Sequence, residues 1–129
     1  MGDRVSISFK DNDDDESVAL FHHWGGTEFP KVAFDWFREF KKSLKSMTRL
    51  ESRNIMAQFV QWLGQRGHYR ECIGFEEGKF DKPLYSDELL SHNIYFGKDQ
   101  NDGDNSDNGH YVIHTIKGEM LDDKGQSIK

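Results

Sequence analysis

The chain has 129 residues, of which 35% are hydrophobic and 31% charged, with a formal net charge of −6. This length suits one domain with a continuous core, and the single cysteine, Cys72, excludes an internal disulfide. The acidic balance argues against direct nucleic-acid binding, which depends on clustered Lys and Arg. No apolar run approaches the roughly 18 residues of a membrane-spanning helix, so we expect no membrane contact and a cytoplasmic location.

Two strands are predicted first. Residues 4–10 alternate polar and apolar side chains, the period of a half-buried strand. Residues 11–16 carry five carboxylates, too many to bury together, which predicts a solvated turn. Apolar character returns over residues 17–24 as a second strand. The short connection predicts an antiparallel hairpin.

Two amphipathic helices follow. Thr27 offers a capping hydroxyl and Pro30 falls in the first turn, and apolar residues recur at helical spacing to about Ser46. Thr48 and Glu51 have the spacing of a capping box for a second helix. Each helix has one apolar stripe, so each should lie on a core.

The remaining chain predicts further strands over residues 69–75, 94–97 and 111–116, separated by polar loops. The order ββααβββ predicts one α+β domain over residues 1–122, with both helices on one face of a mostly antiparallel sheet of about four or five strands. Residues 123–129 are expected to be a disordered tail.

The predicted core combines the inner faces of these strands and helices. Its members are Val5, Ile7, Phe9, Leu20, Phe21, Trp36, Phe37, Phe40, Met56, Phe59, Val60, Leu63, Ile73, Phe96 and Ile113.

Histidines are the main candidates for chemistry. His22 and His23 are adjacent on a strand, so one should face the helices and the other the uncovered side of the sheet. His110 and His114 share a face, but roughly 13 Å separates their side chains. A small metal-dependent or acid–base enzyme would therefore combine His23 with Asp3, His110 or His114. The sequence contains no nucleophile elbow or phosphate-binding loop, and we expect no cofactor.

Two charged segments also stand out. Residues 104–109 match the start of a calcium loop, but Thr115 stands where the bidentate glutamate belongs. A hairpin turn whose Asn and Asp side chains bond their own backbone is the plainer interpretation. A basic stretch near the helix junction is either an ordinary solvated face or an interaction surface. It comprises Arg38, Lys41, Lys42, Lys45, Arg49 and Arg53.

Two motifs carry a resemblance. The M-G-D-R of residues 1–4 and the H-W-G-G of residues 23–26, followed by Glu28 and Pro30, resemble a small family of uncharacterised prokaryotic and phage proteins. The likeness is specific at those motifs and loose elsewhere, and the acidic run and long polar loop of this chain depart from it. The resemblance supports the domain boundaries and implies no reaction. It points to Asp3, Arg4, His23 and Trp24.

A hairpin would place the start of the first strand beside the end of the second, so Asp3 and Arg4 should lie near Trp24. Trp and Arg are enriched at recognition hot spots, and glycine lets a partner approach the backbone closely. The alternative is an Asp3–Arg4 salt bridge that only holds the chain end. We therefore predict a non-catalytic binding module, such as a phage or host accessory protein, that contacts another protein. Its predicted site is Asp3, Arg4, His23, Trp24, Gly25 and Gly26.

Overall fold

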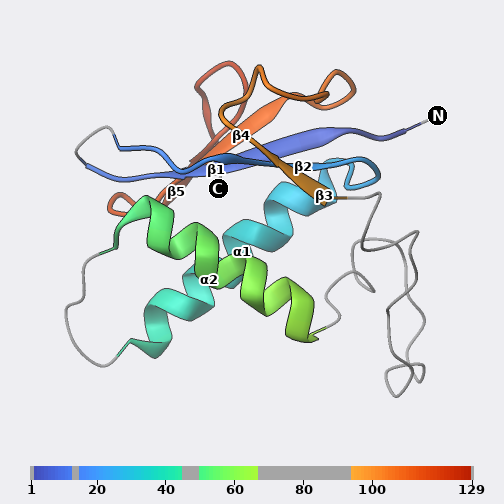
Figure 1. Ribbon diagram of the computed structural model, residues 1–129. Coiled ribbons are helices and arrows are strands. Elements are labelled where there is room, and N and C mark those ends of the chain that lie inside the picture. The colour runs from blue at the N-terminus through green and yellow to red at the C-terminus, as the bar shows by residue number, and fades with distance from the viewer. Residues whose placement is uncertain (1, 13–14, 45–49, 67–93, 129) are drawn as a thin grey trace.

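The computed structural model describes residues 2–12, 15–44, 50–66 and 94–128. Two helices pack on one face of an open, six-stranded, mostly antiparallel sheet (Figure 1), so the predicted α+β class is confirmed with one strand more than expected. No helix in these ranges is long and apolar enough to cross a membrane. The elements are β1 (Val5–Lys10), β2 (Ala19–His22), α1 (Glu28–Ser43), α2 (Ser52–Arg66), β3 (Ile94–Gly97), β4 (His110–His114), β5 (Glu119–Leu121) and β6 (Ser127–Ile128).

The strand order is β3-β2-β1-β4-β5-β6. The predicted hairpin is present, because β1 and β2 pair antiparallel with Val5 opposite His22. In contrast, β1 and β4 run parallel, with Ser6 opposite His110. Parallel neighbours need a crossover connection. The predicted hairpin turn before β4 is therefore wrong, since β3 pairs with β2 and the loop crosses the sheet to reach β4.

The helix-facing side of the sheet carries the main core. Val5, Ile7 and Phe9 alternate towards the helices and are fully buried, and both helices contact β1. The ring of Phe9 lies 6.2 Å from that of Phe37 and 6.0 Å from that of Phe59, so one strand residue joins both helices. Such aromatic contacts stabilise the fold beyond the contribution from burying the surface of the rings.

Most of the predicted core is confirmed. The buried members are Val5, Ile7, Phe9, Leu20, Phe21, Phe37, Met56, Phe59, Leu63 and Ile113. Trp36, Phe40 and Val60 are only partly buried, and Ile73 lies outside the described residues. Phe96 was wrongly included, because it lies on the edge strand β3 and is 56% exposed.

The opposite side of the sheet is covered too, contrary to expectation. The loop of residues 98–109 folds over it (Figure 1), and Phe21 is fully buried there. A Cβ atom on Gly103 would lie only 2.8 Å from the ring of Phe21, so this close approach requires glycine. Asn105 Nδ2 donates to Ser6 Oγ at 2.8 Å and ties the loop to β1.

The acidic run supports α2 and is more than a solvated turn. Asp11 is buried, and its carboxylate accepts the Ser52 backbone N–H at 3.2 Å. The Ser52 hydroxyl donates to the Asp15 carbonyl oxygen at 2.8 Å, and Arg53 pairs with the Asp15 carboxylate at 2.7 Å. A carboxylate is stable at this position because it satisfies a free N–H at the positive end of the helix dipole.

Other predicted boundaries shift. Thr27 precedes α1 without making a side-chain cap bond, and α1 ends at Ser43, before the predicted end. Thr48, of the predicted capping box, lies outside the described residues. Within the segment expected to be a tail, Ser127 and Ile128 form β6 and pair with β5. Asp122 Oδ1 closes their turn by accepting the N–H of Gln126 at 2.9 Å.

Candidate functional site

The predicted binding residues meet where β2 leads into α1, a region we call the N-terminal junction (Asp3, Arg4 and residues 23–26). The Asp3 N–H donates to the His23 carbonyl at 2.8 Å, and the Gly26 N–H donates to the Asp3 carbonyl at 2.9 Å. Gly26 has a φ of +60°, a conformation that favours glycine. Asp3 therefore lies beside His23 and Gly26, and the role of these residues in binding remains a prediction.

Gly25 serves packing at this junction. A Cβ atom at Gly25 would lie 2.7 Å from Phe29 Cβ and 3.0 Å from the side chains of His22 and Val5. The backbone can therefore turn tightly from β2 into α1 only because position 25 lacks a side chain. Gly25 accordingly lies against the core instead of offering a surface to a partner.

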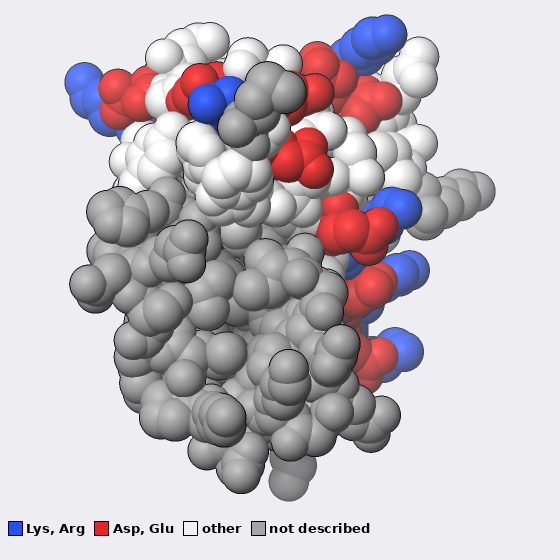
Figure 2. All heavy atoms as spheres, turned by 90° about the vertical axis from the view of Figure 1, so that its right-hand side faces the viewer, with Lys and Arg blue, Asp and Glu red and all other residues white. Residues whose placement is uncertain are grey.

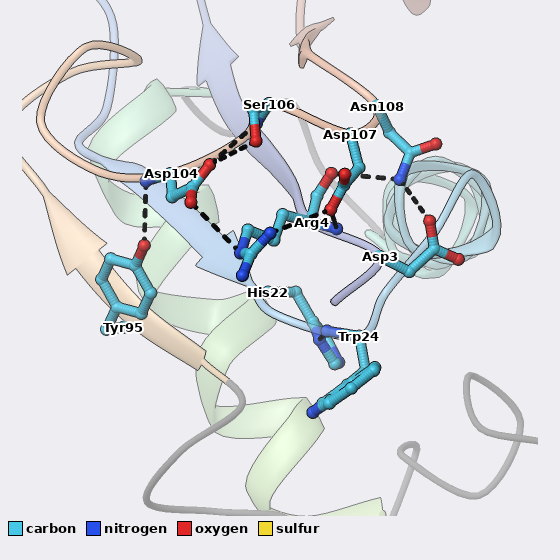
Figure 3. Close-up of polar contacts among 9 residues, drawn as sticks. All are labelled: Asp3, Arg4, His22, Trp24, Tyr95, Asp104, Ser106, Asp107 and Asn108. Atoms are coloured by element: carbon cyan, nitrogen blue, oxygen red, sulfur yellow. Dashed lines mark hydrogen bonds and ion pairs between the residues drawn. The ribbon is translucent and has the colours of Figure 1, made fainter. Parts of the chain in front are cut away.

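Arg4 binds the loop before β4 (Figure 3). Its Nε atom lies 3.2 Å from Asp104 Oδ2, and its Nη1 atom lies 3.4 Å from Asp107 Oδ2. The Arg4 backbone N–H also donates to Asp107 Oδ2 at 2.9 Å. Asp3 instead accepts a hydrogen bond from Asn108 Nδ2 at 2.6 Å. The Arg4 guanidinium thus holds the loop. Asp3 and Arg4 pair with this loop and not with each other, in contrast to the salt bridge considered from the sequence.

The acidic side chains of this loop have local partners. Asp104 Oδ1 accepts the hydroxyl of Ser106 at 2.7 Å and its N–H at 3.0 Å. These hydrogen bonds, with a smaller contribution from Arg4, lower the pKa of the Asp104 carboxyl below its ordinary value. Nowhere in the described ranges do three or more His, Cys, Asp or Glu side chains form a group that could hold a metal ion.

The two adjacent histidines diverge as predicted. His22 is buried, and its ring centroid lies 4.7 Å from that of Phe29. The Trp24 N–H donates to His22 Nδ1 at 3.1 Å, so the neutral imidazole carries its proton on Nε2. His23 lies on the other side, with its ring 4.7 Å from Trp24 in an edge-to-face contact. Trp24 is thereby fixed at both backbone and ring, yet is 44% exposed.

A second cluster, the histidine relay (Ser6, Ser8, Glu16 and His110), lies under the loop of residues 98–109. Ser6 Oγ is 2.7 Å from His110 Nδ1, and Ser8 Oγ is 2.9 Å from His110 Nε2. The Ser8 hydroxyl donates to the Glu16 carboxylate. Both serines and His110 are buried, whereas the Glu16 side chain is 41% exposed.

The hydrogen bonds of the relay run in one direction. Ser8 donates to Glu16, so its oxygen is available to accept from Nε2–H of His110. Nδ1 of that ring is then an acceptor for the hydroxyl of Ser6, whose oxygen already accepts from Asn105. The nearby His110 ring, whose Nε2 atom lies 3.7 Å from Glu16 Oε2, is the main cause that lowers the pKa of Glu16, and burial partly opposes it.

The relay contains the groups of a serine nucleophile and its base, but no hydroxyl is presented to a substrate. Ser6 has no exposed surface and Ser8 is 1% exposed. The direct consequence of the relay is attachment of the loop to β1. Sequence reasoning missed Ser6, Ser8 and Glu16, because only the parallel pairing of β1 with β4 places these serines beside His110.

The residues of the enzyme alternative have separate partners. Asp3 binds Asn108, His23 contacts Trp24, and His110 belongs to the relay. His114 Nδ1 accepts the Lys117 N–H at 3.2 Å, and burial lowers the pKa of His114. Apart from the backbone hydrogen bond from Asp3 to His23, these four residues therefore interact with different side chains and do not form one cluster.

Three of the six residues in the predicted basic stretch pair with acidic side chains. Arg38 pairs with Asp35 at 2.8 Å and Lys42 pairs with Glu39 at 3.5 Å, both within α1. Figure 2 shows Lys and Arg atoms beside Asp and Glu atoms down one edge of the molecule. Arg53 pairs with Asp15, as described above, and Lys45 and Arg49 lie outside the described residues. This surface gives little support to binding by positive charge.

Three large aromatic side chains are exposed where β2 ends and β3 begins, and we call them the aromatic rim (Trp24, Tyr95 and Phe96). Their exposed fractions are 44%, 41% and 56%. Tyr95 stacks on Phe21 with centroids 5.0 Å apart and an interplanar angle of 5°. Its hydroxyl accepts the Asp104 N–H at 3.0 Å (Figure 3). The sequence pointed to Trp24 alone, because Phe96 was assigned to the core.

The resemblance carried by the M-G-D-R and H-W-G-G motifs remains a prediction. The chain matches no protein-family model, no curated protein and no solved structure.

Proposed function

We propose that this protein is a non-catalytic binding module that docks another protein on the aromatic rim. The observation that carries the proposal is the exposure of three large aromatic side chains along one edge of the sheet, Trp24 after the end of β2 and Tyr95 and Phe96 on opposite faces of the neighbouring β3. Aromatic side chains are enriched at protein interfaces, where tryptophan and tyrosine supply much of the binding energy. Most other aromatic residues of the described sheet and helices lie in the core.

The rim is preorganised for binding. Tyr95 is held by its stack on Phe21 and by the Asp104 N–H. Trp24 is held by contact of its ring with the His23 ring and by the hydrogen bond from its backbone N–H to His22 Nδ1. A partner would therefore meet side chains that have already lost much of their conformational freedom, which lowers the entropic cost of association.

The predicted site residues divide into two roles under this proposal. His23 and Trp24 contact the partner. Asp3 and Arg4 are positioning residues, because they fix the chain end and the loop of residues 104–108 beside the rim. Gly25 and Gly26 shape the turn that presents Trp24.

Affinity capture from the source cell tests the proposal. The wild-type protein and the Ile116→Ala variant should retain the same partner, because Ile116 is 41% exposed but follows the far end of β4. Trp24→Ala should reduce the bound partner by about tenfold or more, as expected for a hot-spot residue. Equal recovery with Trp24→Ala and with Phe96→Ser, both folded by circular dichroism, would contradict it.

A further inference from the structure

We infer that the partner segment bound by the aromatic rim is an extended, basic stretch of chain that adds to β3 as a new strand. This inference rests on the proposed function and adds to it the conformation and charge of the partner. It is carried by three observations: the position of β3 in the sheet, the exposure of its side chains, and the acidic loop that follows it.

The first observation is that β3 is an edge strand. Its inner edge pairs with β2, from Ala19 opposite Gly97 to His22 opposite Ile94. In the part of the chain that the structure describes, no strand pairs with the outer edge of β3. An edge strand presents backbone N–H and C=O groups at which an extended peptide can continue the sheet.

The second observation is the exposure of both faces of β3. Tyr95 and Phe96 are adjacent, so their side chains point to opposite faces of the sheet, and they are 41% and 56% exposed. The side chains of an added strand would pack across both rings, as cross-strand neighbours do within a sheet. Burial of the two rings would then accompany backbone pairing.

The third observation is the charge beside β3. Residues 98–107 carry four carboxylates, Asp99, Asp102, Asp104 and Asp107, against one cation, Lys98. Arg4 pairs with Asp104 and Asp107. Asp99 and Asp102 are exposed and use carboxylate oxygens to accept the N–H groups of Asn101 and Lys98, at 2.9 and 2.8 Å. With Arg4 included, four carboxylates face two cations, so the segment stays negative.

This loop returns to β3. Asp102 packs against Gly97, where an added Cβ atom would lie 3.1 Å from Asp102 Cβ. The Asp104 N–H binds the Tyr95 hydroxyl. Lysine or arginine side chains on the Tyr95 face of an added strand would thus meet acidic side chains. Complementary charge of this kind selects a partner and speeds its association.

The same charge argues against a second copy of this chain as the occupant. Antiparallel pairing of two β3 strands would bring two copies of the negative loop together, and each chain carries a net charge of −6. Like charges placed opposite each other across an interface disfavour that pairing. The occupant is therefore a basic segment of a different protein.

The experiment compares two short peptides on the full-length chain. In one peptide lysine alternates with valine, and in the other glutamate replaces lysine. The lysine peptide should bind more tightly at low salt, should weaken as salt rises, and should slow amide hydrogen exchange within Ile94–Gly97. The glutamate peptide should show no such protection.

A pair of double variants tests the source of the charge. Asp99→Asn with Asp102→Asn keeps the oxygens that accept the Asn101 and Lys98 N–H groups but removes two charges. It should weaken the lysine peptide by about fivefold. The control, Asp35→Asn with Glu39→Gln, removes two charges from α1 and should leave affinity unchanged.

Equal binding of the two peptides, protection of amides outside β3 only, or self-association of the free chain through β3 would each overturn the inference. These results would leave the proposed function standing if capture of the natural partner still depended on Trp24. If capture of the natural partner did not depend on Trp24 but the lysine peptide still protected β3, the proposed docking surface would be rejected. The preference of β3 for basic strands would then still stand.

Discussion

At the scale of single residues, Arg4 joins the start of the chain to a loop 103 positions away. Lysine has one compact charged group and cannot reach two carboxylates as the planar guanidinium does. Arg4→Lys should therefore lower the free energy of unfolding by about 1 kcal/mol in urea titration. The control is Arg38→Lys, whose exposed partner lies on the same helix, and it should change stability less. Equal effects of the two substitutions would show that the Arg4 contacts add nothing specific.

Glu16 gives the fold a predicted dependence on pH. Its pKa is lowered from an ordinary value of 4.5, mainly by the neighbouring His110 ring, whose Nε2 atom lies 3.7 Å from Glu16 Oε2. A lowered pKa means that this carboxylate stabilises the fold above pH 4.5, and that the stabilisation is lost as the pH falls through the lowered value. Urea titrations from neutral to acidic pH should show a smaller acid loss of stability for Glu16→Gln. Identical pH profiles would contradict the role of the relay.

Some single-residue contacts could be predicted and others could not. Strand alternation was enough to separate His22 from His23, and the hairpin was enough to bring Asp3 to His23. The partners of Arg4 and His110 depend on a parallel pairing between β1 and β4. No local pattern in either strand specifies that pairing, because the choice depends on how the intervening chain crosses the sheet.

At the scale of elements, α2 begins on a carboxylate supplied by the loop between β1 and β2. Asp11→Ala would leave the Ser52 N–H without this acceptor and remove a negative charge from the positive end of the helix. We expect a loss of about 1 to 2 kcal/mol in thermal or urea unfolding. Asn12→Ala, at the exposed neighbouring position, is the matched control and should be nearly neutral. Equal stabilities would show that Asp11 does not cap the helix.

Sequence patterns predicted both helices and the strands β1 to β4, and missed the two shortest strands, β5 and β6. The apolar stripes of α1 and α2 and the alternation of β1 extend over enough residues to be distinguished from chance patterns in the sequence. In contrast, β6 has only two residues, and its pairing depends on the turn held by Asp122. The loop of residues 98–109 contains turn residues, and nothing in that composition shows that Gly103 packs on Phe21.

At the scale of the whole molecule, the sheet is covered by helices on one side and by a polar loop on the other, and aromatic side chains emerge where β2 meets β3. Phe96 lies opposite the buried Leu20 of β2 but is itself 56% exposed, a difference that the sequence of β3 does not reveal. The exposure of aromatic side chains at this edge depends on the assembled sheet, and it supports the proposed binding function.

Nuclear magnetic resonance mapping of the captured partner on labelled protein tests this claim most directly. The resonances of the Trp24 indole N–H and of the Tyr95 and Phe96 amides should shift or broaden on addition of the partner, while Ile116 should not change. A contact surface centred on Ile116 or on the charged face of α1, with the Trp24 indole unchanged, would contradict the assignment of the aromatic rim as the binding surface.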